Sequence, residues 1–441
     1  MATKTIGGTK KSGDSLVQGI SFVQELGGIE EYRLDSNGLR ILLISDSSVP
    51  VAGCMVTYHV GSRNEAVGHT GATHLLEHLL FKGSEKFNAA KGSSIDMLLE
   101  RKGAAMNAST SFDRTNYYEV LASSELPLAI EIEADRMRTA LFTESNRQSE
   151  MPVVRNEYEW YENESWAALE KEIWAAAYIA HPYHHPIIGW KSDIENVPIE
   201  RLRKFYDDFY WPNNATLTIV GSFDTLTVFA AIRTHFGVHP ASQEPIPTMY
   251  TEEPVQEGPR RVVLKRAGNP VVSIAHKIPS ALHADMPALL VLASVLYEDK
   301  TSRLYKAFID SALATDIMVS CNQTRDPSLF QTSVTLAPST PHQKAEQVAH
   351  KEYERIANDG ISSAELTAAK RAARVYAARR KDGPYALLSA INEDIASGDW
   401  TNFVRLPGAI EGVTVRDVKR VAQTYLVDDQ MTVGWFVNAV A

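Results

Sequence analysis

Hydrophobic residues recur along the first half of the chain in two kinds of pattern. Alternating or continuous apolar runs, which are typical of strands, occur at 39–44, 51–60, 109–122 and 215–220. Apolar residues spaced three and four apart, which predict helices, occur at 71–82, 91–102, 126–141, 152–180 and 200–209. The first half is therefore expected to be an α+β unit in which strands and helices are interspersed.

The second half repeats part of this pattern. A predicted helix, a turn and a strand close the first half at 200–220, and the same succession closes the second half at 415–437. A strand expected at 271–278 likewise resembles the strand at 51–60. The repetition indicates an internal duplication of a unit of about 200 residues. We therefore expect two α+β domains, each a sheet with helices packed on one face.

The two predicted domains are separated by a polar stretch that lacks any period. Five prolines crowd into it, at Pro240, Pro245, Pro247, Pro254 and Pro259. We expect an N-terminal extension at 1–24, an N-terminal domain at 25–236, the linker at 237–258 and a C-terminal domain at 259–441.

Composition and charge exclude several classes of protein. The 441 residues include 54 acidic and 44 basic side chains, and the net charge of −10 argues against a general nucleic-acid binder. No apolar run reaches the roughly 18 residues that a membrane span requires. The N-terminal residues are polar and lack the apolar core of a signal peptide. This predicts a cytoplasmic location for the chain as given, or a periplasmic or organellar one if the chain is a trimmed mature form.

The strongest chemical signal is the pentad His74–Leu75–Leu76–Glu77–His78 within the first predicted helix. Residues four apart lie on one face of a helix, so both imidazoles can reach one metal ion. Two neutral imidazoles and a carboxylate suit zinc, and a catalytic zinc keeps one position open for water. A carboxylate that is not a ligand, here Glu77, can accept the proton of that water as it attacks a carbonyl carbon. The alternative interpretation is that these are ordinary side chains on a helix surface.

Further short motifs accompany the pentad. They occur at 61–65, 107–110, 134–137, 181–183, 189–190, 211–214, 302–305 and 326–327. Together with the pentad, they make nearly the whole chain similar to the M16 (pitrilysin) family of zinc metallopeptidases, the inverzincins. Within that family the chain resembles the two-domain M16B branch, which includes the mitochondrial processing peptidases. The resemblance implies the metallopeptidase αβ-roll, with mainly antiparallel sheets, and a zinc-dependent endopeptidase that hydrolyses peptides or unfolded segments.

The resemblance also implies the rest of the metal site. The family takes its third zinc ligand from a glutamate on a later helix, with another glutamate seven residues before it, and Glu157 and Glu150 match these positions. One Zn2+ ion per chain would be held by His74, His78 and Glu157, with Glu150 orienting a ligand or tuning the site. Glu164 keeps the same spacing and is a rival ligand, although the family pattern favours Glu157. A solvated acidic helix face is the alternative interpretation.

A second histidine cluster comprises His181, His184 and His185. Pro182 and Pro186 place it in a loop, where the spacing that would fix two ligands on one helix face is absent. We therefore do not expect a metal site there. The two cysteines of the chain, at positions 54 and 321, are too few for a disulfide framework and are expected to be small buried hydrophobic residues.

Asn107, Ala108 and Ser109 match the family's edge strand beside the zinc, to which a substrate adds as an extra antiparallel strand. An unpaired strand edge can select extended peptides through main-chain hydrogen bonds. These three residues are therefore the expected substrate-binding residues. Without the neighbouring pentad, a plain sheet edge would be the preferred interpretation.

The second half departs from the family pattern at one place. Active members use an arginine and a tyrosine from this half to hold substrate and stabilise the oxyanion. Here Ile309 stands at the arginine position, and Thr315 or Asp316 stands at the tyrosine position. Arg303 is the nearest guanidinium upstream, but its place in a Ser-Arg-Leu-Tyr element favours a structural role.

Two explanations are consistent with this gap. Either a homologous subunit that lacks the pentad supplies the arginine and the tyrosine in a heterodimer, or the chain is a weak or regulatory paralogue. We favour the heterodimer, because a decayed protein has no reason to keep the pentad together with both later glutamates. The alternative from another functional class is a non-catalytic structural or assembly subunit of the same fold. A purely structural zinc ion is a third interpretation, and it would require four protein ligands.

Overall fold

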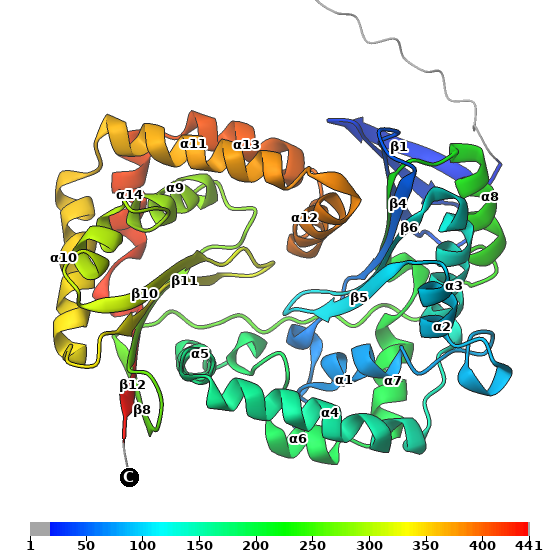
Figure 1. Cartoon of the computed structure of the whole chain (residues 1–441), viewed down its shortest axis with the longest axis horizontal. Coiled ribbons are helices and arrows are strands. Elements are labelled where there is room, and N and C mark those ends of the chain that lie inside the picture. Colours follow the sequence, from blue (N-terminus) through cyan, green and yellow to red (C-terminus); the bar gives the residue numbers. More distant parts are fainter. Residues whose placement is uncertain (1–17, 440–441) are drawn as a thin grey trace, which may run out of the picture.

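The computed structural model describes residues 18–439 of the chain. It contains two separate β-sheets, one in each half of the sequence, with helices packed around both (Figure 1). Residues 1–17, which form most of the expected N-terminal extension, lie outside the described residues.

The first sheet has seven strands in the order β1-β2-β3-β7-β4-β6-β5. These strands are β1 (Ile20–Leu26), β2 (Ile29–Leu34), β3 (Arg40–Ser45), β4 (Val51–Tyr58), β5 (Ala105–Thr110), β6 (Thr115–Ala122) and β7 (Ala215–Gly221). The pair β3–β7 is parallel, and the other neighbouring pairs in this sheet are antiparallel. β5 forms one edge of the sheet, which leaves one side of its backbone without a neighbouring strand.

The second sheet has five strands in the order β10-β11-β9-β12-β8. These strands are β8 (Arg260–Arg266), β9 (Val271–Ile278), β10 (Ala314–Cys321), β11 (Ser328–Leu336) and β12 (Met431–Asn438). The order matches β5-β6-β4-β7-β3 of the first sheet, and the parallel pair, β8–β12, falls at the equivalent place. Two mainly antiparallel sheets of matching order confirm the expected α+β fold class.

Helices surround both sheets. The first half contributes α1 (Ala72–Leu79), α2 (Ile95–Arg101), α3 (Leu126–Thr139), α4 (Glu144–Asn163), α5 (Ser165–Ala177), α6 (Lys191–Asn196), α7 (Ile199–Phe209) and α8 (Thr225–His235). The second half contributes α9 (Met286–Leu296), α10 (His342–Asp359), α11 (Ser363–Arg379), α12 (Gly383–Ser397), α13 (Asn402–Gly412) and α14 (Val415–Tyr425). The largest hydrophobic cluster of each half lies between its sheet and its own helices, and burial of this apolar surface stabilises each unit.

Each sheet is also contacted by one helix from the other half of the chain. α12 packs against β4 and β7 of the first sheet, and α5 packs against β9 and β12 of the second. A glycine lies under each of these helices: a Cβ atom on Gly53 would be 2.5 Å from Leu388, and one on Gly434 would be 2.7 Å from Ile173. Because glycine has no side chain, both helices approach their sheets closely. The two halves of the chain are thereby packed into each other.

Two of the predicted elements are wrong in their extent. The single strand expected at 109–122 is two strands, because a turn closes between them with a 2.8 Å hydrogen bond from the Ser111 amide to the Arg114 carbonyl. The helix expected at 152–180 is two helices, because Glu164 takes an extended backbone (φ −85°, ψ 117°) between α4 and α5. α4 also begins well before Pro152, at a site where the Thr143 side chain accepts a hydrogen bond from the Asn146 amide.

Strand β1 begins at Ile20, before the expected start of the first domain at residue 25. Gly27 and Gly28, both with positive φ, turn the chain into a hairpin with β2, so this strand belongs to the first sheet. Residues 237–258 contain neither helix nor strand. They are nevertheless anchored, since the Glu253 carboxylate accepts hydrogen bonds of 3.0–3.1 Å from the amides of residues 179, 180 and 181.

Two further expectations concern the membrane and the cysteines. Within residues 18–439, no helix combines the length and the apolar character that crossing a membrane requires. Cys54 is buried and Cys321 is half-buried, and both are free thiols. They lie in strands of different sheets, β4 and β10, as residues of the core and its margin.

Candidate active site

The helix α1 carries the pentad and is fixed at its start by the carboxyl group of Glu65. Gly71, with φ of 83°, precedes the helix, and Glu65 accepts hydrogen bonds of 2.7 Å from the amides of Gly71 and Thr73. Burial raises the pKa of Glu65 to about 8. On the helix itself Leu75, Leu76 and Leu79 are fully buried, so the histidines project from the opposite side.

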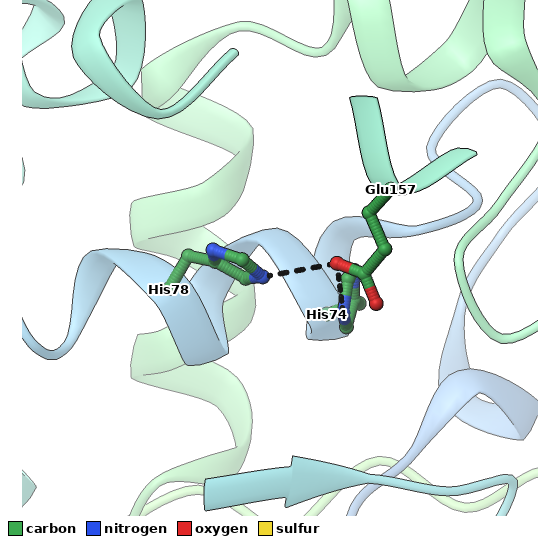
Figure 2. A group of neighbouring side chains, drawn as sticks. All are labelled: His74, His78 and Glu157. Atoms are coloured by element: carbon green, nitrogen blue, oxygen red, sulfur yellow. Dashed lines mark ion pairs between the residues drawn. The ribbon is translucent and has the colours of Figure 1, made fainter. Parts of the chain in front are cut away.

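The two histidines and a glutamate from α4 converge on one point. His74 Nε2 lies 3.5 Å and His78 Nε2 lies 3.6 Å from the same oxygen, Glu157 Oε2 (Figure 2). Their ligand atoms all lie within 4.8 Å of one another, and residues 18–439 contain no other group of three or more such side chains. Two imidazole nitrogens and one carboxylate oxygen form a donor set that suits zinc and leaves a coordination position free.

Glu150 holds one of these histidines from behind. Its Oε2 atom lies 3.2 Å from His78 Nδ1, and its other oxygen pairs with the Lys82 ammonium. A proton on Nδ1 is therefore shared with Glu150, which leaves Nε2 of His78 free to face Glu157. The sequence placed Glu150 on the same face as Glu157, and the structure brings it to a metal-facing histidine rather than to the metal point itself.

Burial and neighbouring charges shift the pKa values of the three converging groups in different directions. Burial lowers the pKa of His74 to about 4, so its imidazole is neutral at physiological pH. The nearby imidazoles of His78 and His74 lower the pKa of Glu157, which keeps this carboxylate ionised. For His78, burial opposes the charged form, but the carboxylates of Glu157 and Glu150 outweigh it and raise the pKa.

Glu77 lies beside this group without belonging to it. Its Oε2 atom accepts a 2.5 Å hydrogen bond from the hydroxyl of Thr110, the last residue of β5. Burial raises the pKa of Glu77, which makes its carboxylate a better proton acceptor than an exposed glutamate. The motif containing Thr110 was visible in the sequence, but its contact with Glu77 depends on how β5 packs beside α1.

The rival metal ligands do not join the site. Glu164 sits at the break between α4 and α5, outside the helix that carries Glu157. In the second histidine cluster, His181 Nε2 lies 3.1 Å from Asp326, His184 Nδ1 lies 3.1 Å from a main-chain carbonyl, and His185 Nδ1 lies 3.8 Å from Glu65. These histidines link loops of the fold, and the structure does not bring their nitrogens together.

The expected substrate-binding residues lie on the edge strand next to Glu77. The amide of Ala108 donates a 2.9 Å hydrogen bond to the side chain of Asn107 rather than to β6, so the main chain of Ala108 faces the free edge. The side chain of Ser109 is instead engaged within the sheet, donating to Asn116 at 2.7 Å. An extended peptide could add beside Ala108 after displacing the Asn107 side chain.

A cavity of about 400 Å³ opens beside the metal point and the edge strand. Its walls include five aromatic side chains that no motif in the sequence indicated, from the loop after β5 and from α4 and α5. They are Phe112, Tyr158, Tyr161, Trp166 and Trp174. The concentration of tryptophan and tyrosine between residues 158 and 174 was the available signal, and it was interpreted only as helix.

The second half offers no arginine and tyrosine at the positions where the family pattern places them. Ile309 packs against the hydrophobic cluster of this half, and the Thr315 hydroxyl bonds to a main-chain carbonyl. The guanidinium of Arg303 is held by Glu365 at 2.7 and 3.1 Å and by the carbonyl of Gly360. A structural role for Arg303 follows from these contacts.

Comparison with known proteins places both halves in one group. Residues 40–191 match the profile of insulinase, peptidase family M16, and residues 196–373 match the profile described as the peptidase M16 inactive domain. The zinc protease PqqE of Helicobacter pylori is 30% identical over 406 residues, which cover 90% of each chain. The mitochondrial-processing peptidase subunit beta of Lentinula edodes is 24% identical over 433 residues, 94% of this chain and 91% of that protein. The crystal structure of a protease from Helicobacter pylori, 29% identical, matches with a TM-score of 0.89 and covers 93% of this chain and 100% of that one.

Proposed function

This chain belongs to the M16 peptidase family, and on that premise we propose that it is a zinc-dependent endopeptidase that hydrolyses peptides or unfolded segments. The observation that carries the proposal is the convergence of His74, His78 and Glu157 next to a separate carboxylate and a free strand edge. A structural zinc ion would need a fourth protein ligand, and the described residues offer three.

The mechanism follows from the contacts of the chain's own residues. His74, His78 and Glu157 would hold the zinc ion, and Glu150 orients His78 through Nδ1. When bound, zinc acts as a Lewis acid that polarises the substrate carbonyl and acidifies water. Glu77 would accept a proton at Oε1 or Oε2 from the water whose oxygen bonds to the peptide carbonyl carbon, and would return it to the amide nitrogen as the C–N bond breaks. The hydrogen bond from Thr110 fixes the direction of that carboxylate.

Zinc content tests the ligand assignment. The wild-type chain is expected to hold one zinc ion, and His74→Ala, His78→Ala and Glu157→Ala are each expected to lose it, as measured by elemental analysis of the folded protein. Glu164→Ala is the matched control, because it removes a neighbouring carboxylate that does not face the site. A full zinc equivalent in folded Glu157→Ala, or its loss in Glu164→Ala, would overturn the assignment.

We further propose that the chain works with a homologous subunit that lacks the pentad and supplies an arginine and a tyrosine. The contacts of Ile309, Thr315 and Arg303 support this, because none of them offers a free donor for an oxyanion. A relative that is named as one subunit of a peptidase, the mitochondrial-processing peptidase subunit beta, also supports it.

Reconstitution tests the need for a partner. The isolated chain is expected to hold zinc but to cleave unstructured peptides poorly, and the partner should raise the rate on the order of 10²–10³-fold, the effect of one oxyanion donor. Co-purification from the native source identifies the partner. Full activity of the isolated chain, with no second polypeptide detectable, would refute the heterodimer.

A further inference from the structure

Arg114 lies in the turn between β5 and β6 and is 9% exposed. Its Nη1 atom donates hydrogen bonds to the carbonyl of Ser109 at 2.9 Å, to the Ser109 hydroxyl at 2.6 Å and to Asn116 Oδ1 at 2.9 Å. Its Nε and Nη2 atoms donate to Glu393 Oε1 at 3.1 and 2.6 Å. The guanidinium is thus shared between the edge strand of the first sheet and one carboxylate.

That carboxylate comes from the other half of the chain, 279 residues away in sequence. Glu393 lies on α12, which packs against the first sheet (Figure 1). The preceding residue on this helix, Asn392, is 2% exposed, accepts a 2.7 Å hydrogen bond from Thr57 and donates one of 3.2 Å to Glu393. The side chain of Glu393 is 51% exposed, but its Oε1 atom is held by three donors.

The opposite face of β5 is held by the catalytic region. Successive side chains of a strand point to opposite faces, so Ser109 and Thr110 project to different sides of the sheet. Ser109 contacts Arg114, and Thr110 donates to Glu77. The last two residues of β5 are therefore fixed from both faces, while the outer edge of the strand stays free for a peptide.

We propose that the Arg114–Glu393 ion pair positions the end of β5, so that the second half of the chain sets the place of the substrate-binding edge and of the Thr110–Glu77 contact. The inference rests on the proposed function, since it assigns positioning residues to the same site. Neither residue touches the reacting atoms in this scheme; both act through Ser109 and Thr110.

The charge of Arg114 lies in a nearly buried guanidinium whose partner, Glu393, is half-exposed. A buried guanidinium is costly unless its charge is paired, and removal of the carboxylate leaves Nε and Nη2 without their acceptor. The guanidinium then turns toward water, where its charge is solvated. Because the guanidinium is planar and rigid, this rotation also breaks the hydrogen bonds from Nη1 to Ser109. The end of β5 loses its anchor on one face, which weakens strand addition and loosens the hydroxyl that directs Glu77.

Hydrogen exchange tests the positioning directly and does not depend on proteolysis. The zinc-loaded full-length chain is compared with Glu393→Ala and Glu393→Gln by mass spectrometry of the amides in 105–110. Glu411→Gln is the matched control, because it removes a carboxylate that pairs with Arg374 on the surface of the second half, far from β5 in its contacts. Binding of a fluorescein-labelled unstructured peptide to the Glu77→Gln chain, with and without Glu393→Ala, measures strand addition.

Glu393→Ala is expected to exchange these amides about tenfold faster and to bind the peptide about tenfold more weakly, with the Gln variant intermediate, because a charged hydrogen bond is lost. Zinc content and the exchange of β7 should match the wild type. Unchanged exchange and unchanged peptide affinity in Glu393→Ala, or equal changes in Glu411→Gln, would overturn the proposal. A wild-type chain without zinc, or without cleavage after reconstitution with its partner, would instead refute the proposed function, and the exchange data would still report on the Arg114–Glu393 ion pair.

Discussion

The helices α1 and α9 occupy equivalent places in the two halves of the molecule. α1 follows β4 and α9 follows β9, and these strands hold the same position in the matching strand orders. α9 is apolar along Met286–Leu296 and carries no ionisable side chain, whereas α1 presents two histidines and a glutamate. The same architectural position thus serves packing in one half and chemistry in the other.

The difference lies in how each helix is supported. α9 is stabilised by burying its own apolar side chains, seven of which are buried. α1 keeps only its leucine face for packing, and burying the polar groups on the other face costs free energy unless they are hydrogen-bonded. Glu150 on α4 and Thr110 on β5 provide such bonds to His78 and Glu77, and Glu65 accepts the main-chain amides at the start of the helix. A functional helix therefore depends on neighbours that a packing helix does not need.

The largest effect is expected when α1 loses the carboxylate of Glu77 but keeps its packing. Glu77→Gln should lower the rate of peptide hydrolysis by about 10²–10⁴-fold, because the amide cannot accept the proton. Zinc content should stay at the wild-type value, because no ligand is lost. Initial rates with an unstructured peptide, measured on the active assembly, and elemental analysis check this; a rate within tenfold of the wild type would show that Glu77 is not the base.

The next prediction concerns a buried side chain of α9, the apolar counterpart of α1. Leu292→Ala in α9 should lower the free energy of unfolding by about 2–5 kcal/mol, since it opens a cavity at a fully buried position. Zinc affinity should not change. Leu76→Ala in α1 should cost similar stability and also weaken zinc binding, because that helix carries the ligands. Denaturant unfolding and zinc titration distinguish the two variants, and equal zinc affinities would contradict the comparison.

The support at the start of α1 predicts a dependence on pH. Burial raises the pKa of Glu65 to about 8 from an ordinary value of 4.5, so the folded state holds this proton more tightly than the unfolded chain. Its contribution to stability is full below pH 4.5 and is lost as the pH rises through about 8, by an amount on the order of a few kcal/mol. Glu65→Gln should flatten the dependence of the unfolding free energy on pH over this range. The variant should also be less stable overall, because one of the two oxygens that accept main-chain amides is replaced by an NH2 donor. Denaturant midpoints of both proteins measured from pH 5 to 9 check this. Parallel profiles for the wild type and Glu65→Gln would show that Glu65 does not cause the pH dependence.

A smaller effect, on zinc affinity, is expected from Glu150, which contacts His78 Nδ1. Glu150→Gln should weaken zinc binding by about 10–100-fold, because a neutral amide holds the Nδ1 proton less firmly than a carboxylate. Competition with a zinc chelator measures the affinity. Glu144→Gln, at the exposed start of the same helix, is the control and should bind zinc like the wild type. Equal affinities in both variants would mean that Glu150 does not orient His78.

The smallest effect compares the turns before the two edge strands. Gly103, with φ of 66°, precedes β5, and Ala312, with φ of 55°, precedes β10 at the same distance. An alanine in this conformation is strained by about 1–2 kcal/mol, and a glycine regains part of it. Ala312→Gly should therefore raise the free energy of unfolding by about 0.5–1 kcal/mol, measured by denaturant unfolding. A loss of stability would show that the strain is absent.

Much of the site could be predicted from the sequence because its signals are local. His78 follows His74 by four positions and Glu157 follows Glu150 by seven, so helical geometry alone aligns each pair. The choice between Glu157 and Glu164 was not local. It depends on the break of the backbone at residue 164, which hydrophobic spacing did not reveal because apolar residues continue into α5.

The remaining features were decided by packing between distant segments. The strand expected at 109–122 and the helix expected at 152–180 had the right character and the wrong extent, because turns are set by hydrogen bonds that residue spacing does not encode. The packing of each of α5 and α12 on the sheet of the other half depends on a glycine that lets the helix approach the strands closely, Gly434 for α5 and Gly53 for α12.

The sequence by itself therefore determined the duplicated α+β pattern and the residues that converge on the metal point, since strand alternation and helical periodicity act within a few residues. Tertiary structure alone decided which groups support them. Thr110 contacts Glu77 because β5 packs beside α1, and Glu393 contacts Arg114 across 279 residues because α12 packs on the first sheet. Such contacts follow from the burial of surfaces that lie far apart along the chain, and no local pattern in the sequence records them.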